Sequence, residues 1–330
     1  MTEKTEMTIK TEPPASNDAQ GMTIVARTQG QLVRRRFFRH RGALVGMILF
    51  GLVFLLAFSS IGFGPIPGWW DKPWTGSGTV VDRGRPTLSV IPEFLGGEGM
   101  HLGEHPFGQD NIGKDYFAMT MRGAQVSIIV ALTIGLVSTA VGTVLGALAG
   151  FFRGKVEAVI MRFTDVMITI PVLVIAAVVG SATGNLGPYF MAIMLGLITW
   201  TSVTRLVRGE FLSLREKEFV EAARAVGTSS MRIIFKHILP NTLGVIIVSA
   251  TLAISSGILL ETALSFLGFG VKSPDTSLGL LISDYKNAMV TRPWLFWWPG
   301  LFIVAIALSV NFIGDGLRDA FDPRQNRVRD

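Results

Sequence analysis

Long stretches without a charged residue constrain this sequence more than any other feature. Four windows contain no Asp, Glu, Lys or Arg, namely 42–70, 123–152, 166–204 and 293–314. A fifth apolar stretch, 238–271, contains only Glu261. A helix that crosses a bilayer needs about 20 apolar residues, and turn residues at Gly180–Pro188 divide the longest window into two helices. The sequence therefore predicts an all-α integral membrane protein with six spans, near 42–62, 125–151, 157–180, 188–207, 241–268 and 293–314.

The third predicted span contains a proline and two charges. We expect Pro171 to kink this helix, which membrane helices tolerate when neighbouring groups satisfy the freed carbonyl. To be long enough the helix must also include Arg162 and Asp165. These two residues lie three apart, so they can pair on one helix face.

The chain carries little charge, and its basic residues are unevenly placed. Only 16% of its 330 residues are charged, against about 25% in soluble domains. If the N-terminus is cytoplasmic, 22 of the 30 Lys and Arg residues fall on the inner side of the membrane and 8 on the outer side. This bias predicts that both termini are cytoplasmic. The net charge of +6 therefore reflects topology and gives no reason to expect a nucleic-acid partner.

The predicted spans divide the chain into five regions. They are a polar cytoplasmic leader with a basic pre-membrane segment (1–41), a first span (42–62), an extracytoplasmic loop (63–124), a five-helix core (125–314) and a cytoplasmic tail (315–330). The polar leader is too long for the start of a cleaved signal peptide. We expect residues 1–25 to be disordered. Residues 64–100, rich in Gly, Pro and Trp, look like an insertion in the outer loop.

Several kinds of chemistry are excluded or disfavoured. The chain has no Cys, which excludes disulfides and thiolate zinc sites, and its four His residues are too scattered to predict a metal site. Gly108–Lys114 has the spacing of a phosphate-binding loop, but Asp115 stands where Ser or Thr should bind magnesium. We therefore predict that this chain is not an enzyme and binds no cofactor of its own.

The loop between the fourth and fifth predicted spans, 205–240, has a distinctive local pattern. Leu214–Val226 is composed of helix-forming residues and places Phe219, Ala222, Ala223 and Val226 on one face. Gly227 is predicted to stop this helix in the left-handed conformation. Residues 228–230 can cap a second helix that runs to residue 239, before Pro240. We expect a compact helix–turn–helix that another protein can dock on, although an amphipathic connector resting on headgroups has the same pattern.

The spacing within this loop resembles the EAA loop of ABC importer permeases. The match consists of Glu-Ala-Ala at 221–223, a glycine four residues after the last alanine, and Leu-Pro at 239–240. The general pattern has Ile ten residues after the glycine; this chain has His there and Ile next, as dipeptide and oligopeptide permeases do. The resemblance implies a six-span type I (MetI-like) importer fold. It also implies ATPase-coupling roles for Glu221, Ala222, Ala223, Gly227, His237, Ile238 and Pro240.

Three further stretches resemble the C-type subunit of the dipeptide, oligopeptide and nickel permeases: residues 105–115, 261–270 and 311–323. The resemblance implies a permease subunit that forms half of a translocation pathway in a bacterial inner membrane. Its implied partners are a second permease, one or two cytoplasmic ATPase subunits that bind ATP and magnesium, and an extracytoplasmic substrate-binding protein. Di- and oligopeptides are the implied substrates, with nickel chelates or glutathione as alternatives.

Glu261 and a glycine stripe are the remaining candidates within the spans. Glu261 lies 21 residues after Pro240, or about 31 Å along a helix, and so close to the outer interface. Two roles remain open for it: a structural or gate-packing hydrogen bond, and contact with a substrate amine. Gly142, Gly146 and Gly150 permit close helix packing, either within this chain or against a partner.

Two other classes of function have less support. An intramembrane enzyme needs paired acids or a Ser–His arrangement at membrane depth, and the sequence has neither. An autonomous channel or ion-coupled carrier needs polar pore residues or a charge relay, and Glu261 alone is weak support for one.

Overall fold

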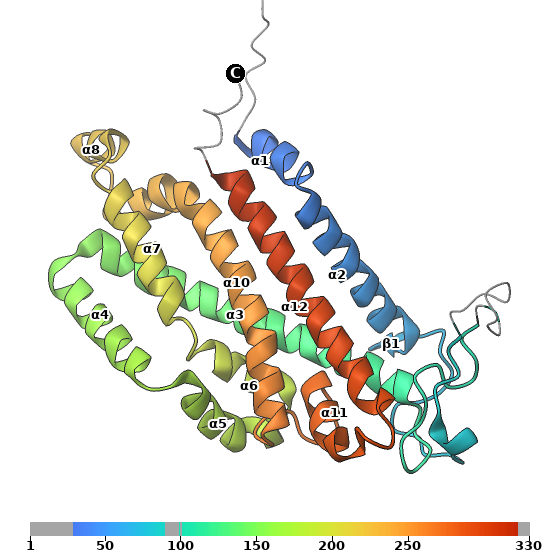
Figure 1. Ribbon diagram of the computed structural model, residues 1–330. Coiled ribbons are helices and arrows are strands. Elements are labelled where there is room, and N and C mark those ends of the chain that lie inside the picture. The colour runs from blue at the N-terminus through green and yellow to red at the C-terminus, as the bar shows by residue number, and fades with distance from the viewer. Residues whose placement is uncertain (1–28, 90–98, 100, 323–330) are drawn as a thin grey trace, which may run out of the picture.

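The computed structural model describes residues 29–89, 99 and 101–322 as a bundle of helices (Figure 1). Four of the described helices are long and apolar enough to cross a membrane: α2 (Arg41–Ser60), α3 (Tyr116–Phe152), α10 (Leu239–Phe266) and α12 (Trp294–Phe321). Two bent pairs bring the number to as many as six, if each pair is one span. The all-α membrane fold expected from the sequence is therefore confirmed. The predicted disordered leader lies outside the described residues.

The first bent pair breaks where the sequence predicted a kink. Helices α4 (Gly154–Thr169) and α5 (Val172–Thr183) meet at 86°. Ile170 and Pro171, between them, are extended. Proline removes a backbone donor and disfavours helical conformation in the residue before it, so the helix ends here rather than bending gently.

The second bent pair is a break that the sequence pattern did not predict. Helices α6 (Pro188–Gly196) and α7 (Thr201–Leu214) meet at 42°, within what was expected to be one span. The predicted turn before them is present: a short 3₁₀ helix, η3 (Gly184–Leu186), leads to Gly187, whose φ is +93°. Pro188 then occupies the first turn of α6, where its missing N–H has no cost.

The long helices pack in a layered arrangement. Helix α12 lies between α2 and α10, and α3 crosses them to contact both α7 and α10 (Figure 1). One buried apolar cluster joins α2, α3, α10, α11 and α12, and a second joins α3, α7, residues 220 and 223, and residues 233–238. The α4–α5 pair forms one edge of the bundle (Figure 1).

The smaller elements lie at the two ends of the bundle. At one end are α1 (Gln29–Phe37), α8 (Glu218–Ala225), α9 (Ser230–Arg232) and the end of α12 (Figure 1). At the other are the antiparallel strands β1 (Gly62–Phe63) and β2 (Ile66–Pro67), and the helices η1 (Asp82–Gly84), α11 (Leu278–Tyr285) and η5 (Lys286–Ala288).

Helix α3 begins nine residues before the predicted start of its span. Its first turns contain Arg122, a charge that the apolar pattern treated as a boundary. The Arg122 guanidinium pairs with both carboxylate oxygens of Asp275, at 2.9 and 3.0 Å, and lies over the Trp74 ring. This pairing lets the charge sit inside the helix at the end of the bundle.

Candidate functional site

Most of the predicted site residues lie in the loop between α7 and α10, which we call the α7–α10 loop (residues 215–238). Its first helix, α8, begins four residues later than predicted, because residues 215–217 form a turn. The predicted left-handed stop is confirmed, since Gly227 has a φ of +75°. Its N–H donates to the Arg224 carbonyl at 2.9 Å, and that of Thr228 donates to Ala223 at 3.0 Å. These two bonds form a Schellman motif, which satisfies the last carbonyls of α8.

The second half of the loop runs directly into α10. After α9 the chain forms one π-helical segment, η4 (Ile233–Ile238), and Pro240 lies in the first turn of α10. In a π-helical turn each N–H donates to the carbonyl five residues earlier, so the hydrogen-bonding pattern changes just before Pro240, which has no N–H to donate. Ile238 is fully buried and His237 half-buried. The second helix expected from the sequence is thus an extension of the membrane helix.

Helix α8 has an inward and an outward apolar face. Val220 and Ala223 are buried. Phe219, Ala222 and Val226, predicted to share a face with Ala223, point outward, and Val226 is 81% exposed. Residues 220 and 223 are three apart and share the buried side of the helix, whereas 219 and 222, also three apart, share the neighbouring exposed side. Glu221 and Gly227 are also exposed.

Two more large apolar side chains are exposed on the second half of the loop. Met231 is 54% exposed and Phe235 62% exposed. Together with Phe219, Ala222 and Val226 they form what we call the loop's outer face. Large apolar side chains exposed together commonly mark an interaction surface.

A glycine seam holds α7 against α3. Gly142, Gly146 and Gly150 face α7, so the stripe packs within this chain. A Cβ on Gly146 would lie only 2.7 Å from the Thr204 carbonyl oxygen, and one on Gly150 would lie 2.6 Å from Cβ of Phe211. Small residues at this spacing allow two membrane helices to approach closely.

The α7–α10 loop is also attached to the end of α3. The Arg215 guanidinium donates to the Phe151 carbonyl and lies 5.9 Å from the centre of the Phe151 ring. Arg224, from α8, lies 5.8 Å from the same ring. Arg153, the residue after α3, pairs with Glu216 at 3.1 Å. The loop therefore rests on the same end of α3 that the glycine seam joins to α7.

Ion pairs connect α7 to α4. Arg205 pairs with Asp165 at 2.6 Å, and Nε of Arg208 donates to Glu157 at 2.8 Å. The predicted pair between Asp165 and Arg162 on one helix is therefore not what the structure shows. The carboxylate of Asp165 turns to the neighbouring helix, a partner that spacing along α4 does not reveal.

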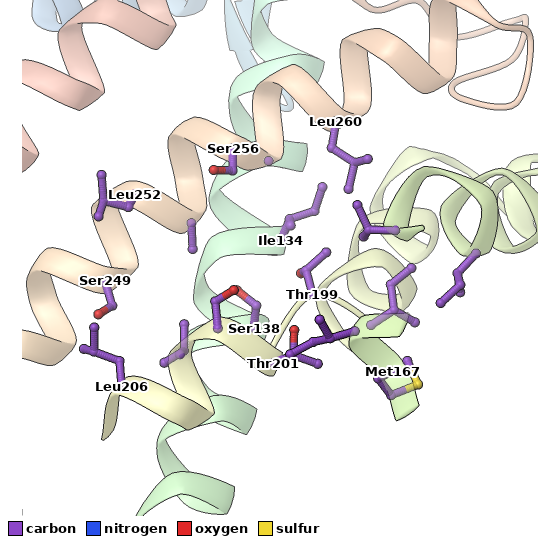
Figure 2. A pocket seen from close by; sticks show the side chains of 18 of the residues that line it. Ile134, Ser138, Met167, Thr199, Thr201, Leu206, Ser249, Leu252, Ser256 and Leu260 are labelled. Atoms are coloured by element: carbon purple, nitrogen blue, oxygen red, sulfur yellow. The ribbon is translucent and has the colours of Figure 1, made fainter. Parts of the chain in front are cut away.

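A cavity of about 550 Å³ lies between these helices, at membrane depth (Figure 2). Its walls come from α3, from α10 and from both helix breaks, the one at Pro171 and the one at Ile198–Thr199. Six hydroxyl-bearing side chains project from the walls: Ser138, Thr199, Thr201, Ser202, Ser249 and Ser256. The sequence pattern did not indicate these residues, and Pro171 is the local signal nearest to them.

Glu261 does not line this cavity, although contact with a substrate amine was one of the two roles left open for it. Its side chain is fully buried and accepts hydrogen bonds from Ser127 at 2.9 Å and Ser265 at 2.7 Å. The Ser127 hydroxyl in turn accepts from the N–H of Leu278, at the start of α11, at 3.2 Å. The geometry favours the structural interpretation, in which Glu261 joins α10, α3 and α11. It lies toward the opposite end of the bundle from the α7–α10 loop.

In the segment with phosphate-loop spacing, residues 108–114, backbone N–H groups donate to one of the protein's own carboxylates. Asp110 accepts the N–H groups of Ile112 at 2.9 Å and Lys114 at 2.8 Å, and Tyr285 donates to it at 2.9 Å. Burial, followed by the charge of Asp110, raises the pKa of the Tyr285 phenol well above its ordinary value, so it remains a donor. Asp115 accepts from the N–H of Ala118 at 2.7 Å and so caps α3. These amides are not available to a phosphate.

Comparison with known proteins gives consistent matches. Residues 142–327 match the family described as binding-protein-dependent transport system inner membrane component, and residues 28–67 match the N-terminal TM domain of oligopeptide transport permease C. The oligopeptide transport system permease protein OppC of Haemophilus influenzae is 36% identical over 303 residues, covering 92% of this chain and 91% of that protein. The protein of the same name in Mycobacterium tuberculosis is 39% identical over 68% of this chain and 78% of its own length. A putative peptide permease protein of Brucella ovis is 40% identical over 67% of this chain and 74% of its own.

Proposed function

The chain belongs to the family of binding-protein-dependent transport system inner membrane components, and on that premise we propose that it is one transmembrane subunit of an ATP-driven importer of di- and oligopeptides. In this role it is a non-catalytic subunit, and ATP and magnesium bind to partner subunits. The names of its relatives support the peptide substrate. Nickel chelates and glutathione are the alternative cargoes.

The observation that carries this proposal is the loop's outer face. Val226, Met231 and Phe235 are exposed at one end of the bundle, on a loop whose inner side is firmly packed against α3 and α7. An apolar surface on a rigid support is suited to docking a protein. We propose that one or two cytoplasmic ATPase subunits dock here, and that Glu221, Ala222 and Gly227 border the contact.

The cavity supplies this chain's half of the translocation pathway in the proposed complex. Exposed apolar side chains on α4 and α5, among them Val159, Phe163 and Val178, offer a surface on which a second permease subunit packs. Helix α7 links the two sites, because it enters the α7–α10 loop at one end and lines the cavity at the other.

The proposed orientation places the α7–α10 loop and both termini in the cytoplasm of a bacterium. It is supported by the 22 Lys and Arg residues on that side and by the common location of α1, α8 and the end of α12 (Figure 1). An extracytoplasmic substrate-binding protein would then meet the opposite end, which carries β1 and α11.

Two exposed valines at opposite ends of the bundle provide a direct test. Val226 is 81% exposed on the loop's outer face, and Val290 is 93% exposed between α11 and α12. We expect Val226→Asp to abolish co-purification of the ATPase subunits and peptide uptake in cells, and Val290→Asp to preserve both. Normal uptake by the Val226 variant would contradict the docking assignment. Uptake by the purified chain without any ATPase would contradict the importer itself, and a competition assay with nickel chelates and glutathione identifies the cargo.

A further inference from the structure

The cavity wall is mostly apolar, bears six hydroxyls and carries no charge. Within the described part of the chain, none of the side chains that line it is ionisable: six bear hydroxyls and the rest are apolar. A cavity built to hold an ammonium or carboxylate group needs an opposite charge, because an unpaired ion at membrane depth is costly. This half of the pathway therefore has no group that selects a charged side chain.

The hydroxyls supply both hydrogen-bond donors and acceptors. Thr199 and Ser249 each donate to the carbonyl oxygen four residues earlier, at 3.1 and 2.7 Å, which leaves their lone pairs free to accept. Ser138 is fully buried and donates to the carbonyl three residues earlier at 3.1 Å. Thr201 and Ser256 form no hydrogen bond with any described residue and can turn either way (Figure 2). A peptide backbone presents one donor and one acceptor per residue, which is the pattern that rotatable hydroxyls match.

The backbone around the cavity is also irregular at two places. Ile170 and Pro171 are extended between α4 and α5, and Ile198 and Thr199 lie in the break between α6 and α7. Irregular backbone at membrane depth is tolerated where it lines a polar cavity rather than lipid. Both breaks add peptide groups to a wall whose side chains are hydroxyl or apolar.

Resting on the proposed importer function, we propose that this cavity is a subsite for the uncharged backbone of a peptide, which the hydroxyls at Thr201, Ser202 and Ser256 hold without regard to its side chains. Apolar side chains of the peptide lie against the Ile, Leu and Val lining. Charged side chains cross this half without a counter-ion.

Introducing a charge tests whether transported peptide passes through the cavity. The assembled transporter is reconstituted in vesicles with saturating binding protein, and uptake per ATP is measured for tetra-alanine and for versions that carry one Lys or one Glu. We expect Ser256→Asp to raise the ratio of Lys-peptide to Glu-peptide uptake by at least about fivefold relative to wild type, and Ser256→Lys to lower it. Comparing ratios removes the selectivity of the binding protein, which is the same in all samples.

The control is Ser181→Asp, on an exposed part of α5 outside the cavity lining, which should leave the ratio unchanged. Ser202→Asp is the second cavity variant, to be used if Ser256 variants do not assemble. Double replacement of Ser202 and Ser256 by Ala should slow all three peptides by a similar factor, about threefold. Unchanged ratios in cavity variants that still transport would overturn the subsite. If wild type takes up none of these peptides, the proposed function fails instead.

Discussion

Helix α7 is held on its two sides in opposite ways. On the α3 side the glycine seam brings the backbones together, and Val203, Val207 and Phe211 are buried in it. On the α4 side the contact is made by two ion pairs, whose side chains are 21% to 52% exposed, and by stacking of Phe163 on Trp200, the residue before α7. Close-packed seams have one good arrangement, whereas exposed ion pairs contribute only about 0–1 kcal/mol and re-form readily. The difference identifies α3 and α7 as a rigid unit, and α4 as the element that can move against it.

Disrupting the turn that ends α8 should have the largest effect on transport. We expect α7 to carry movement of the α7–α10 loop to the glycine seam and to the ion pairs with α4. Gly227→Pro should then abolish peptide uptake while the protein still accumulates in the membrane. Proline cannot adopt the φ of +75° found here, and it lacks the N–H that donates to Arg224. Uptake assays, with ATPase co-purification, measure the effect.

Two further variants show whether the loss in the Gly227 variant concerns docking. Glu221→Lys reverses an exposed charge on α8 without altering its backbone, and should cause the same loss of ATPase binding. Gly227→Ala should retain part of the uptake, because the left-handed conformation costs an alanine only about 1–2 kcal/mol. Normal uptake by both the Pro and the Lys variants would refute the coupling role of the loop.

Adding one methyl group to the glycine seam should reveal its rigidity. A Cβ at position 146 would lie 2.7 Å from the Thr204 carbonyl oxygen and 2.8 Å from Cβ of Val207, so backbone must move. We expect Gly146→Ala to destabilise the protein by about 1–3 kcal/mol, measured by thermal unfolding in detergent. The matched control is Gly209→Ala on α7, where a new Cβ meets no atom within 4 Å. Equal unfolding temperatures for the two variants would show that the seam is not tightly packed.

Reversing a charge on the other side should affect transport more than stability. Glu157→Arg places two cations together where Arg208 now binds a carboxylate. We expect the free energy of unfolding to change by less than about 1 kcal/mol, while uptake per ATP falls several-fold because α4 is held away from α7. The exchanged pair, Glu157→Arg with Arg208→Glu, should recover uptake. Arg162→Gln, on an exposed part of α4, is the control expected to have no effect.

Added salt should weaken the ion pairs between α4 and α7 slightly and leave the glycine seam unchanged. Raising ionic strength from about 0.1 to 1 M shortens the screening length from about 10 to 3 Å. The coupling energy between Glu157 and Arg208, from a double-mutant cycle on unfolding, should decrease accordingly. The destabilisation caused by Gly146→Ala should stay constant, because steric overlap does not depend on ions. A coupling energy between Glu157 and Arg208 that does not change with salt would contradict the difference between the α3 and α4 sides of α7.

The sequence was informative where local pattern decides the structure. Charge-free windows located the membrane helices, Pro171 located one break, and Gly227 located the end of α8, because each depends on residues close together in the chain. The glycine stripe predicted close packing but left open which helix it would meet.

Features that depend on distant residues were not predictable in this way. Asp165 pairs with Arg205 forty residues away, and the charge of Arg122 inside α3 is paired with Asp275, 153 residues later. The α6–α7 break occurs without a proline, so the local pattern carries no signal for it. The cavity exists only because two breaks and two straight helices come together, and no one segment of sequence contains it.

The two breaks also have a consequence for how the protein enters its membrane. Helix α5 has 12 residues and α6 has 9, which gives lengths of about 18 and 14 Å, against a hydrocarbon thickness of about 30 Å. Neither helix can span the bilayer by itself. They are joined by the turn at Gly184–Gly187, so they have to be inserted as a hairpin together with α4 and α7. Biogenesis of this region is therefore a cooperative step, and a truncation that ends between α5 and α6 leaves a segment too short for stable insertion.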